Sequence, residues 1–152
     1  MKQTQTKPSI RAEDVVFKTH KVFTSELEIY LKESNAFGNV YFSEFFNFQG
    51  TMREKWWKHL APDLAQRGYM VVTKYAGNKF LQSAYPFTII IGELTVTKLT
   101  PVSLDLKICF KDPETGKYIS EGTQKAAFLD IQTHQFKKLP EDILTKVREY
   151  VM

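Results

Sequence analysis

The sequence contains a single cysteine and few histidines, which narrows the chemistry to consider. One cysteine, Cys109, cannot form an intramolecular disulfide, and nothing beside it predicts an activated thiolate. The three histidines, His20, His59 and His134, are too far apart in sequence to match a metal-ligand spacing. We therefore expect no metal, no organic cofactor and no cysteine nucleophile.

Long hydrophobic runs and blocks of one charge are also missing. The longest strongly apolar stretch, 87–91, is far shorter than the ~20 residues that cross a bilayer. The polar start, 1–7, is not followed by a signal-peptide segment. The 21 Lys and Arg against 17 Asp and Glu give a net charge of +4, without a run dense enough for a nucleic-acid arm. These features predict a cytoplasmic protein that binds neither membrane nor nucleic acid.

The length and the apolar content predict one domain. A chain of 152 residues with 43% hydrophobic residues is long enough to build one core. Residues 1–13 are polar and aperiodic, which is typical of a flexible tail. We expect the single domain to span residues 14–152.

The hydrophobic periodicity changes along the chain from strand to helix. Leu27, Ile29 and Leu31 share one face at period two, which predicts a strand within 15–31. From 40 to about 60, two neighbouring apolar stripes predict a helix that is buried over much of its girth, with Asn39 as its N-cap. A helix this aromatic cannot face water, so a sheet must cover it.

The second half of the chain predicts strands and one short helix. Turn residues separate the apolar runs and indicate an antiparallel meander. Pro140, followed by acidic residues and then basic ones, predicts a terminal helix. The fold class is therefore α+β. The expected strands are 70–75, 79–85, 94–99, 102–110 and 118–131, with a turn at 76–78.

Two motifs, ESNAFGNVYF over residues 33–42 and QGTMRE over residues 49–54, carry a family resemblance. Over roughly residues 17–130 the chain resembles hotdog-fold thioesterases of the 4-hydroxybenzoyl-CoA thioesterase branch. Within that superfamily, the motifs look most like the thioesterases that accompany iterative polyketide synthases of enediyne clusters. The resemblance implies a hotdog fold, in which an antiparallel sheet wraps around a long central helix.

Asn35 constrains the implied mechanism more than any other residue. The hydroxybenzoyl branch usually has an aspartate at the matching position, whereas the polyketide enzymes resemble this chain in having asparagine. An amide neither attacks a thioester nor accepts a proton near neutral pH, so no anhydride forms at residue 35. We expect direct attack by a water molecule that Asn35 orients. The alternative is that Asn35 is simply a turn residue.

The start of the predicted helix offers hydrogen-bond donors for a thioester oxygen. Backbone N–H groups at a helix N-terminus are unpaired and lie at the positive end of the helix dipole. Val40 and Tyr41 would supply these donors. Gly38 would allow the substrate close to the backbone, and the Asn39 side chain would cap another donor.

Two further residues of the same helix, Phe45 and Gln49, are assigned to substrate binding. The polyketide enzymes commonly have a tyrosine where Phe45 stands, so this chain lacks that hydroxyl. The aromatic surroundings, including Trp56 and Trp57, suit a long apolar tunnel but are equally typical of the core of any hotdog protein.

The resemblance marks Arg53 as catalytic. A helix rising ~1.5 Å per residue would put Arg53 roughly 20 Å beyond Val40, so we expect it to act in trans across a homodimer that pairs into a tetramer. A structural ion pair between Arg53 and a carboxylate such as Glu44 or Glu54 of a neighbouring chain is the alternative.

The resemblance therefore implies a thioesterase. The expected substrate is a polyene or β-ketoacyl chain on the acyl carrier protein of a polyketide synthase. One alternative is a general acyl-CoA thioesterase. Because residue 35 is not a carboxylate, another is an acyl-binding hotdog protein without turnover.

Overall fold

The computed structural model describes residues 19–152, so the predicted tail over 1–13 lies outside the described residues. Residues 19–152 form five strands, two α-helices and one short 3₁₀ helix. In chain order the elements are β1 (Phe23–Glu28), η2 (Leu31–Glu33), α1 (Glu44–Leu60), β2 (Tyr69–Phe80), β3 (Ile89–Thr100), β4 (Ser103–Lys111), β5 (Tyr118–Asp130) and α2 (Glu141–Arg148).

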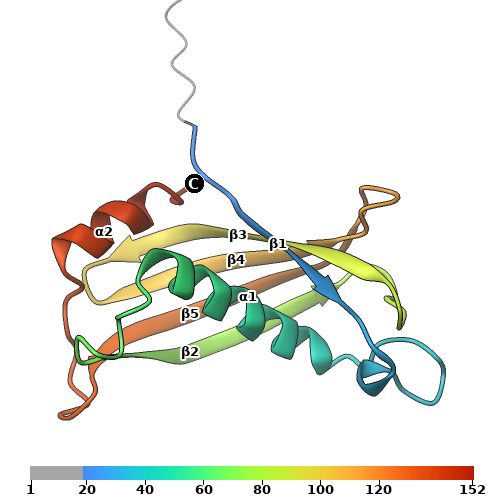
Figure 1. The fold of residues 1–152 in the computed structure, drawn as a ribbon, viewed down its shortest axis with the longest axis horizontal. Coiled ribbons are helices and arrows are strands. Elements are labelled where there is room, and N and C mark those ends of the chain that lie inside the picture. The colour runs from blue at the N-terminus through green and yellow to red at the C-terminus, as the bar shows by residue number, and fades with distance from the viewer. Residues whose placement is uncertain (1–18) are drawn as a thin grey trace, which may run out of the picture.

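The strands form one antiparallel sheet in the order β1-β3-β4-β5-β2. Strands β3, β4 and β5 make the predicted meander, while β1 and β2 are the two edges. Helix α1 lies across one face of this sheet, and α2 covers its end (Figure 1). The α+β arrangement predicted from periodicity is therefore confirmed.

The aromatic face of α1 fills the space between helix and sheet. Met52 and Trp56 are completely buried. Phe48 packs edge-on against Phe110 of β4 at 6.0 Å between ring centroids, and Trp57 packs against Phe128 of β5 at 5.9 Å. Burying large aromatic side chains is the main stabilising contribution of such an interface, because each removes a large apolar area from water.

The structure corrects the prediction of two strands at 70–75 and 79–85. Residues 69–80 form one continuous strand, and the expected turn at 76–78 pairs instead with residues 122–124 of β5. Strand β5 is long enough to pair with all of β2, and a bulge between Thr73 and Tyr75 absorbs the irregularity. Tertiary pairing has overridden the local turn signal.

The start of the long helix also differs from the prediction. Helix α1 begins at Glu44 with Ser43 as its N-cap, rather than at Val40 with Asn39 as the cap. Val40 instead forms an isolated antiparallel bridge with Ser34. Residues 40–43, which precede the helix, thus form a β-bridge and a turn. No helix within residues 19–152 is long and apolar enough to span a membrane.

Candidate functional site

The loop before α1 is closed by its own hydrogen bonds. The N–H of Asn35 donates to the Asn39 carbonyl at 2.9 Å, and the N–H of Gly38 donates to the Asn35 carbonyl at 3.1 Å. The Asn35 side-chain Oδ1 accepts from the N–H of Phe37 at 2.8 Å. Gly38 has a φ of +83°, which favours glycine. Asn35 therefore shapes this loop and leaves the Phe37 ring 94% exposed at its tip.

The backbone donors predicted at Val40 and Tyr41 are already paired within the chain. The N–H of Val40 donates to the Ala84 carbonyl at 2.8 Å, and that of Tyr41 donates to the Glu33 carbonyl at 2.9 Å. The expectation of two unpaired donors here is wrong, because the helix begins four residues later and this segment is tied to the β2–β3 connection. Val40 and Tyr41 position the loop beside the helix start.

The unpaired donors lie two residues further along the chain. The N–H groups of Phe42 and Ser43 have no hydrogen-bond partner among residues 19–152. They stand at the positive end of the α1 dipole, where a developing negative charge is stabilised. Sequence reasoning missed them, although Ser43 is a favoured N-cap residue and Glu44 an acidic residue suited to a first turn.

A cavity of about 270 Å³ lies next to this helix start. Asn39 enters it, with Nδ2 donating to Ser83 Oγ at 3.4 Å and Oδ1 buried without a partner among the described residues. The structure thus brings three predicted site residues together here. The lining consists of Asn39, Val40, Phe42, Phe45, Phe80, Leu81, Gln82, Ser83 and Ala84.

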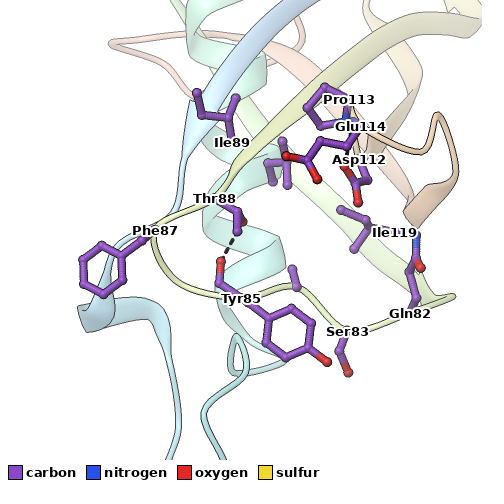
Figure 2. A pocket seen from close by; sticks show the side chains of 12 residues that line it. Gln82, Ser83, Tyr85, Phe87, Thr88, Ile89, Asp112, Pro113, Glu114 and Ile119 are labelled. Carbon is purple, nitrogen blue, oxygen red and sulfur yellow. Dashed lines mark hydrogen bonds between the residues drawn. The ribbon is translucent and has the colours of Figure 1, made fainter.

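A larger cavity of about 450 Å³ lies on the other side of the 82–84 segment, which lines both. Figure 2 shows the carboxylates of Asp112 and Glu114 directed into it from the β4–β5 turn, with Tyr85 and Ser83 on the lower side. Its apolar part includes the buried side chains of Ile90 and Ile119. The acidic wall disfavours a phosphate group and leaves the apolar part suited to a hydrocarbon chain.

Arg53 lies in the middle of α1 and reaches the edge of the sheet. Its Nη1 donates to Thr73 Oγ1 of β2 at 2.7 Å and to Gln124 Oε1 of β5 at 3.0 Å. Within the described part of the chain, no carboxylate comes within ion-pair distance of it. Burial lowers the Arg53 pKa, and the nearby charge of Glu54 acts in the opposite direction. The guanidinium is thus a half-buried cation held by neutral groups.

Gln49 is completely buried between α1 and the sheet. Its Nε2 donates to the Gly77 carbonyl at 3.2 Å and to Asn78 Oδ1 at 3.0 Å, and its Oε1 accepts from Gln124 Nε2 at 3.1 Å. Gln49 does not line either cavity described above, and neither does Asn35. The predicted site residues therefore form two groups, one at the helix start and one around Arg53.

The remaining candidate groups show no reactive arrangement. Cys109 is buried on the side of β4 away from α1, and burial raises its thiol pKa. Residues 19–152 bring no three His, Cys, Asp or Glu side chains together in a metal-binding cluster. The ring of His59 stacks on Phe23 at 5.9 Å.

The family comparison accounts for most of the chain. The model of the Thioesterase-like superfamily matches residues 29–147, and the chain belongs to this superfamily. The fold is the hotdog fold of its thioesterases. No curated protein shows significant sequence similarity to the chain.

Solved structures of two thioesterases and of one hypothetical protein share this fold at low sequence identity. The dynemicin thioesterase, studied for polyene binding, superposes with a TM-score of 0.78 at 18% identity over 87% of this chain and 99% of its own. Slr0204, a 1,4-dihydroxy-2-naphthoyl-CoA thioesterase from Synechocystis, superposes with a TM-score of 0.75 at 17% identity, over 85% of this chain and 97% of its own. The hypothetical protein SAV2348 from Staphylococcus aureus, in complex with CoA, superposes with a TM-score of 0.81 at 11% identity, over 90% of this chain and 87% of its own.

Proposed function

We propose that this protein hydrolyses the thioester of a polyene or β-ketoacyl chain carried by the acyl carrier protein of a polyketide synthase. Membership of the Thioesterase-like superfamily supports thioester hydrolysis. The single observation that carries the proposal is the pair of N–H groups at Phe42 and Ser43, which have no partner in the described part of the chain and lie beside an aromatic cavity at the start of α1. The polyketide substrate is favoured by the motif resemblance and by the fold shared with a polyene-binding thioesterase.

The helix start stabilises the oxyanion in this mechanism. Phe42 and Ser43 donate to the thioester oxygen as a water molecule attacks the carbonyl carbon. Asn35 lines neither cavity, but its Oδ1 keeps a second lone pair besides the one that accepts from Phe37, and in this proposal that lone pair orients the water. The tetrahedral intermediate then collapses and the carbon–sulfur bond breaks. One proton of the attacking water passes to the leaving sulfur, so that a thiol and a carboxylic acid are released. Val40, Tyr41 and Gly38 hold the loop in place.

The acyl chain occupies the aromatic cavity. Phe42, Phe45 and Phe80 supply ring faces and edges for a conjugated chain, with 5.5 Å between the ring centroids of Phe45 and Phe80. Asn39, Gln82 and Ser83 are the polar residues in the lining of this cavity. A longer chain continues past residues 82–84 into the larger cavity, whose apolar wall includes Ile90 and Ile119.

A homodimer completes the site. Strand β2 is a 12-residue sheet edge, and Tyr75 and Phe80 on it are about half exposed, so it can pair with another strand. Arg53 bonds to Thr73 on this same edge. Pairing through β2 would bring Arg53 of one subunit towards the helix start of the other, where its charge supports the oxyanion. Such dimers pair into a tetramer, and the protein acts in the cytoplasm.

A general acyl-CoA thioesterase is the second candidate, favoured by the fold shared with proteins that act on or bind CoA compounds. The test is a mass-spectrometric hydrolysis assay of the purified protein with one acyl chain presented on a carrier protein and on CoA. Faster release from the carrier supports the proposal, and equal or faster release from CoA favours the second candidate. Binding without release from either donor indicates the acyl-binding alternative.

A further inference from the structure

We propose that Gln124 and Gln49 are positioning residues that hold the Arg53 guanidinium in one orientation. The inference rests on the proposed function, in which Arg53 supports the oxyanion. It assigns a role to two buried amides that line neither of the two cavities described above.

The hydrogen bonds of these residues run in one direction. Arg53 Nη1 donates to Gln124 Oε1 at 3.0 Å, and Gln124 Nε2 donates to Gln49 Oε1 at 3.1 Å. Gln49 Nε2 then donates to the Gly77 carbonyl and to Asn78 Oδ1. Each amide is fixed in its flip state by the next acceptor, so the oxygen of Gln124 must face Arg53.

Burial of the two glutamine side chains holds these hydrogen bonds in one geometry. Gln49 is 0% exposed and Gln124 is 4% exposed, so neither amide can exchange its partner for water. Side chains of this type are mostly exposed in proteins, and burying them is tolerated only when their polar atoms are paired. The sheet also makes room for Gln49, because a Cβ at Gly122 would clash with the Gln49 Nε2.

These hydrogen bonds leave part of the Arg53 guanidinium free to donate to a ligand. Nη1 uses its two hydrogens on Thr73 and Gln124, while Nε and Nη2 have no partner among the described residues. Neutral partners fix the group without cancelling its charge. A glutamate at 124 would fix it equally well but would neutralise it. An oriented and uncompensated cation is what stabilisation of a transition-state charge requires.

The test combines turnover with a spectroscopic readout of the arginine. Gln124→Leu removes the acceptor, Gln124→Glu keeps an acceptor and adds a negative charge, and Gln132→Leu is the exposed control. Nitrogen-15 NMR follows the Arg53 Nη signals, assigned by their loss in Arg53→Lys. Restricted rotation of the guanidinium gives separate Nη signals, and free rotation averages them.

The expected results separate orientation from charge. Gln124→Leu should average the Nη signals and lower kcat by on the order of 10²-fold with little change in KM. Gln124→Glu should keep the signals separate and still lower kcat. Separate signals in Gln124→Leu, or a kcat within about twofold of the wild-type value in either variant, would overturn the inference.

Failure of the proposed function itself would look different. In that case the wild-type protein releases no product, or Arg53→Lys is as active as the wild type, whatever stands at 124. The catalytic use of the orientation then falls together with the function. A fall in kcat in Arg53→Lys with no effect of either Gln124 substitution overturns only the positioning role.

Discussion

The N–H of Val40 donates to the carbonyl of Ala84 at 2.8 Å, joining the loop before α1 to the β2–β3 connection. This bond, with that of Tyr41 to Glu33, removes the first two candidate donors and leaves Phe42 and Ser43 for a ligand. The bond also brings the 82–84 segment, which lines both cavities, against the loop. One backbone contact thus organises both the proposed oxyanion donors and the proposed acyl cavity.

Removing the Phe42 N–H should impair hydrolysis without unfolding the loop. An ester in place of the peptide bond between Tyr41 and Phe42 deletes this donor and keeps both side chains. Loss of one oxyanion donor costs on the order of 10²- to 10³-fold in kcat. Steady-state thiol release measures the effect. An ester between Ile131 and Gln132 is the control, because it removes an N–H that bonds only to Asp130 Oδ1 in a loop that lines neither cavity. Equal kcat values for the two esters would exclude Phe42 as the donor.

Substitutions of Asn35 should separate its loop role from its catalytic role. Asn35→Asp retains the acceptor for the Phe37 N–H, so the thermal midpoint should stay near that of the wild type. Asn35→Ala loses that bond and should be less stable by about 1 kcal/mol. Both variants should hydrolyse the thioester more slowly. Alanine lacks the oxygen that orients the water in the proposed mechanism, and aspartate puts a negative charge beside the proposed oxyanion.

Intact-protein mass spectrometry during turnover can detect the result that would contradict the proposed role of Asn35. If Asn35→Asp turns over faster than the wild type and accumulates an acyl-enzyme, the site is built for a carboxylate nucleophile. The water-attack route would then be incorrect for this scaffold.

Gly122 and Gly50 should respond to alanine in opposite directions. A methyl group at Gly122 meets Gln49 and the Ile108 carbonyl, so Gly122→Ala should destabilise the protein by about 1–3 kcal/mol. Gly50 lies inside α1 with nothing within 4 Å of a Cβ, so Gly50→Ala should stabilise it by about 0.5–1 kcal/mol. Urea unfolding measures both changes. An unchanged free energy of unfolding in Gly122→Ala would show that Gln49 does not need this space.

Cys109 should be unreactive in the native protein. Burial raises its pKa, so at pH 8 it holds less thiolate than a free cysteine, and thiolate is the reactive form. Labelling with Ellman's reagent should be slow in buffer and fast in denaturing urea. Fast labelling before unfolding would contradict the burial of Cys109 in the structure.

The sequence predicts the helix and the meander because their hydrophobic periods are strong. The stripes of α1 include the fully buried Met52 and Trp56, and the last strand is predicted within one residue of its observed end. The single strand β2 was missed because Ala76-Gly77-Asn78 is a local turn signal. Only pairing with β5, almost fifty residues away, makes that segment a strand.

The sequence brings some of the candidate site residues to one cavity, but it does not reveal their hydrogen bonds. Asn39 and Phe45 do line a cavity near the helix start. The pairing of Val40 with Ala84 depends on a segment distant in sequence, which no local pattern reveals. The same holds for Gln49, whose partners come from two other strands. Local propensities place the elements, whereas long-range contacts decide which polar groups stay available.

The most direct test of the account is the hydrolysis of a carrier-bound acyl thioester by wild type, Arg53→Met and the control Arg148→Met. Arg148 is an exposed arginine bonded to Glu141, so its loss changes the charge equally without touching the site. The account predicts turnover by the wild type and the control, and a loss of at least about 10²-fold in kcat for Arg53→Met with the dimer intact. Wild-type protein without turnover, or Arg53→Met as active as the control, would contradict it.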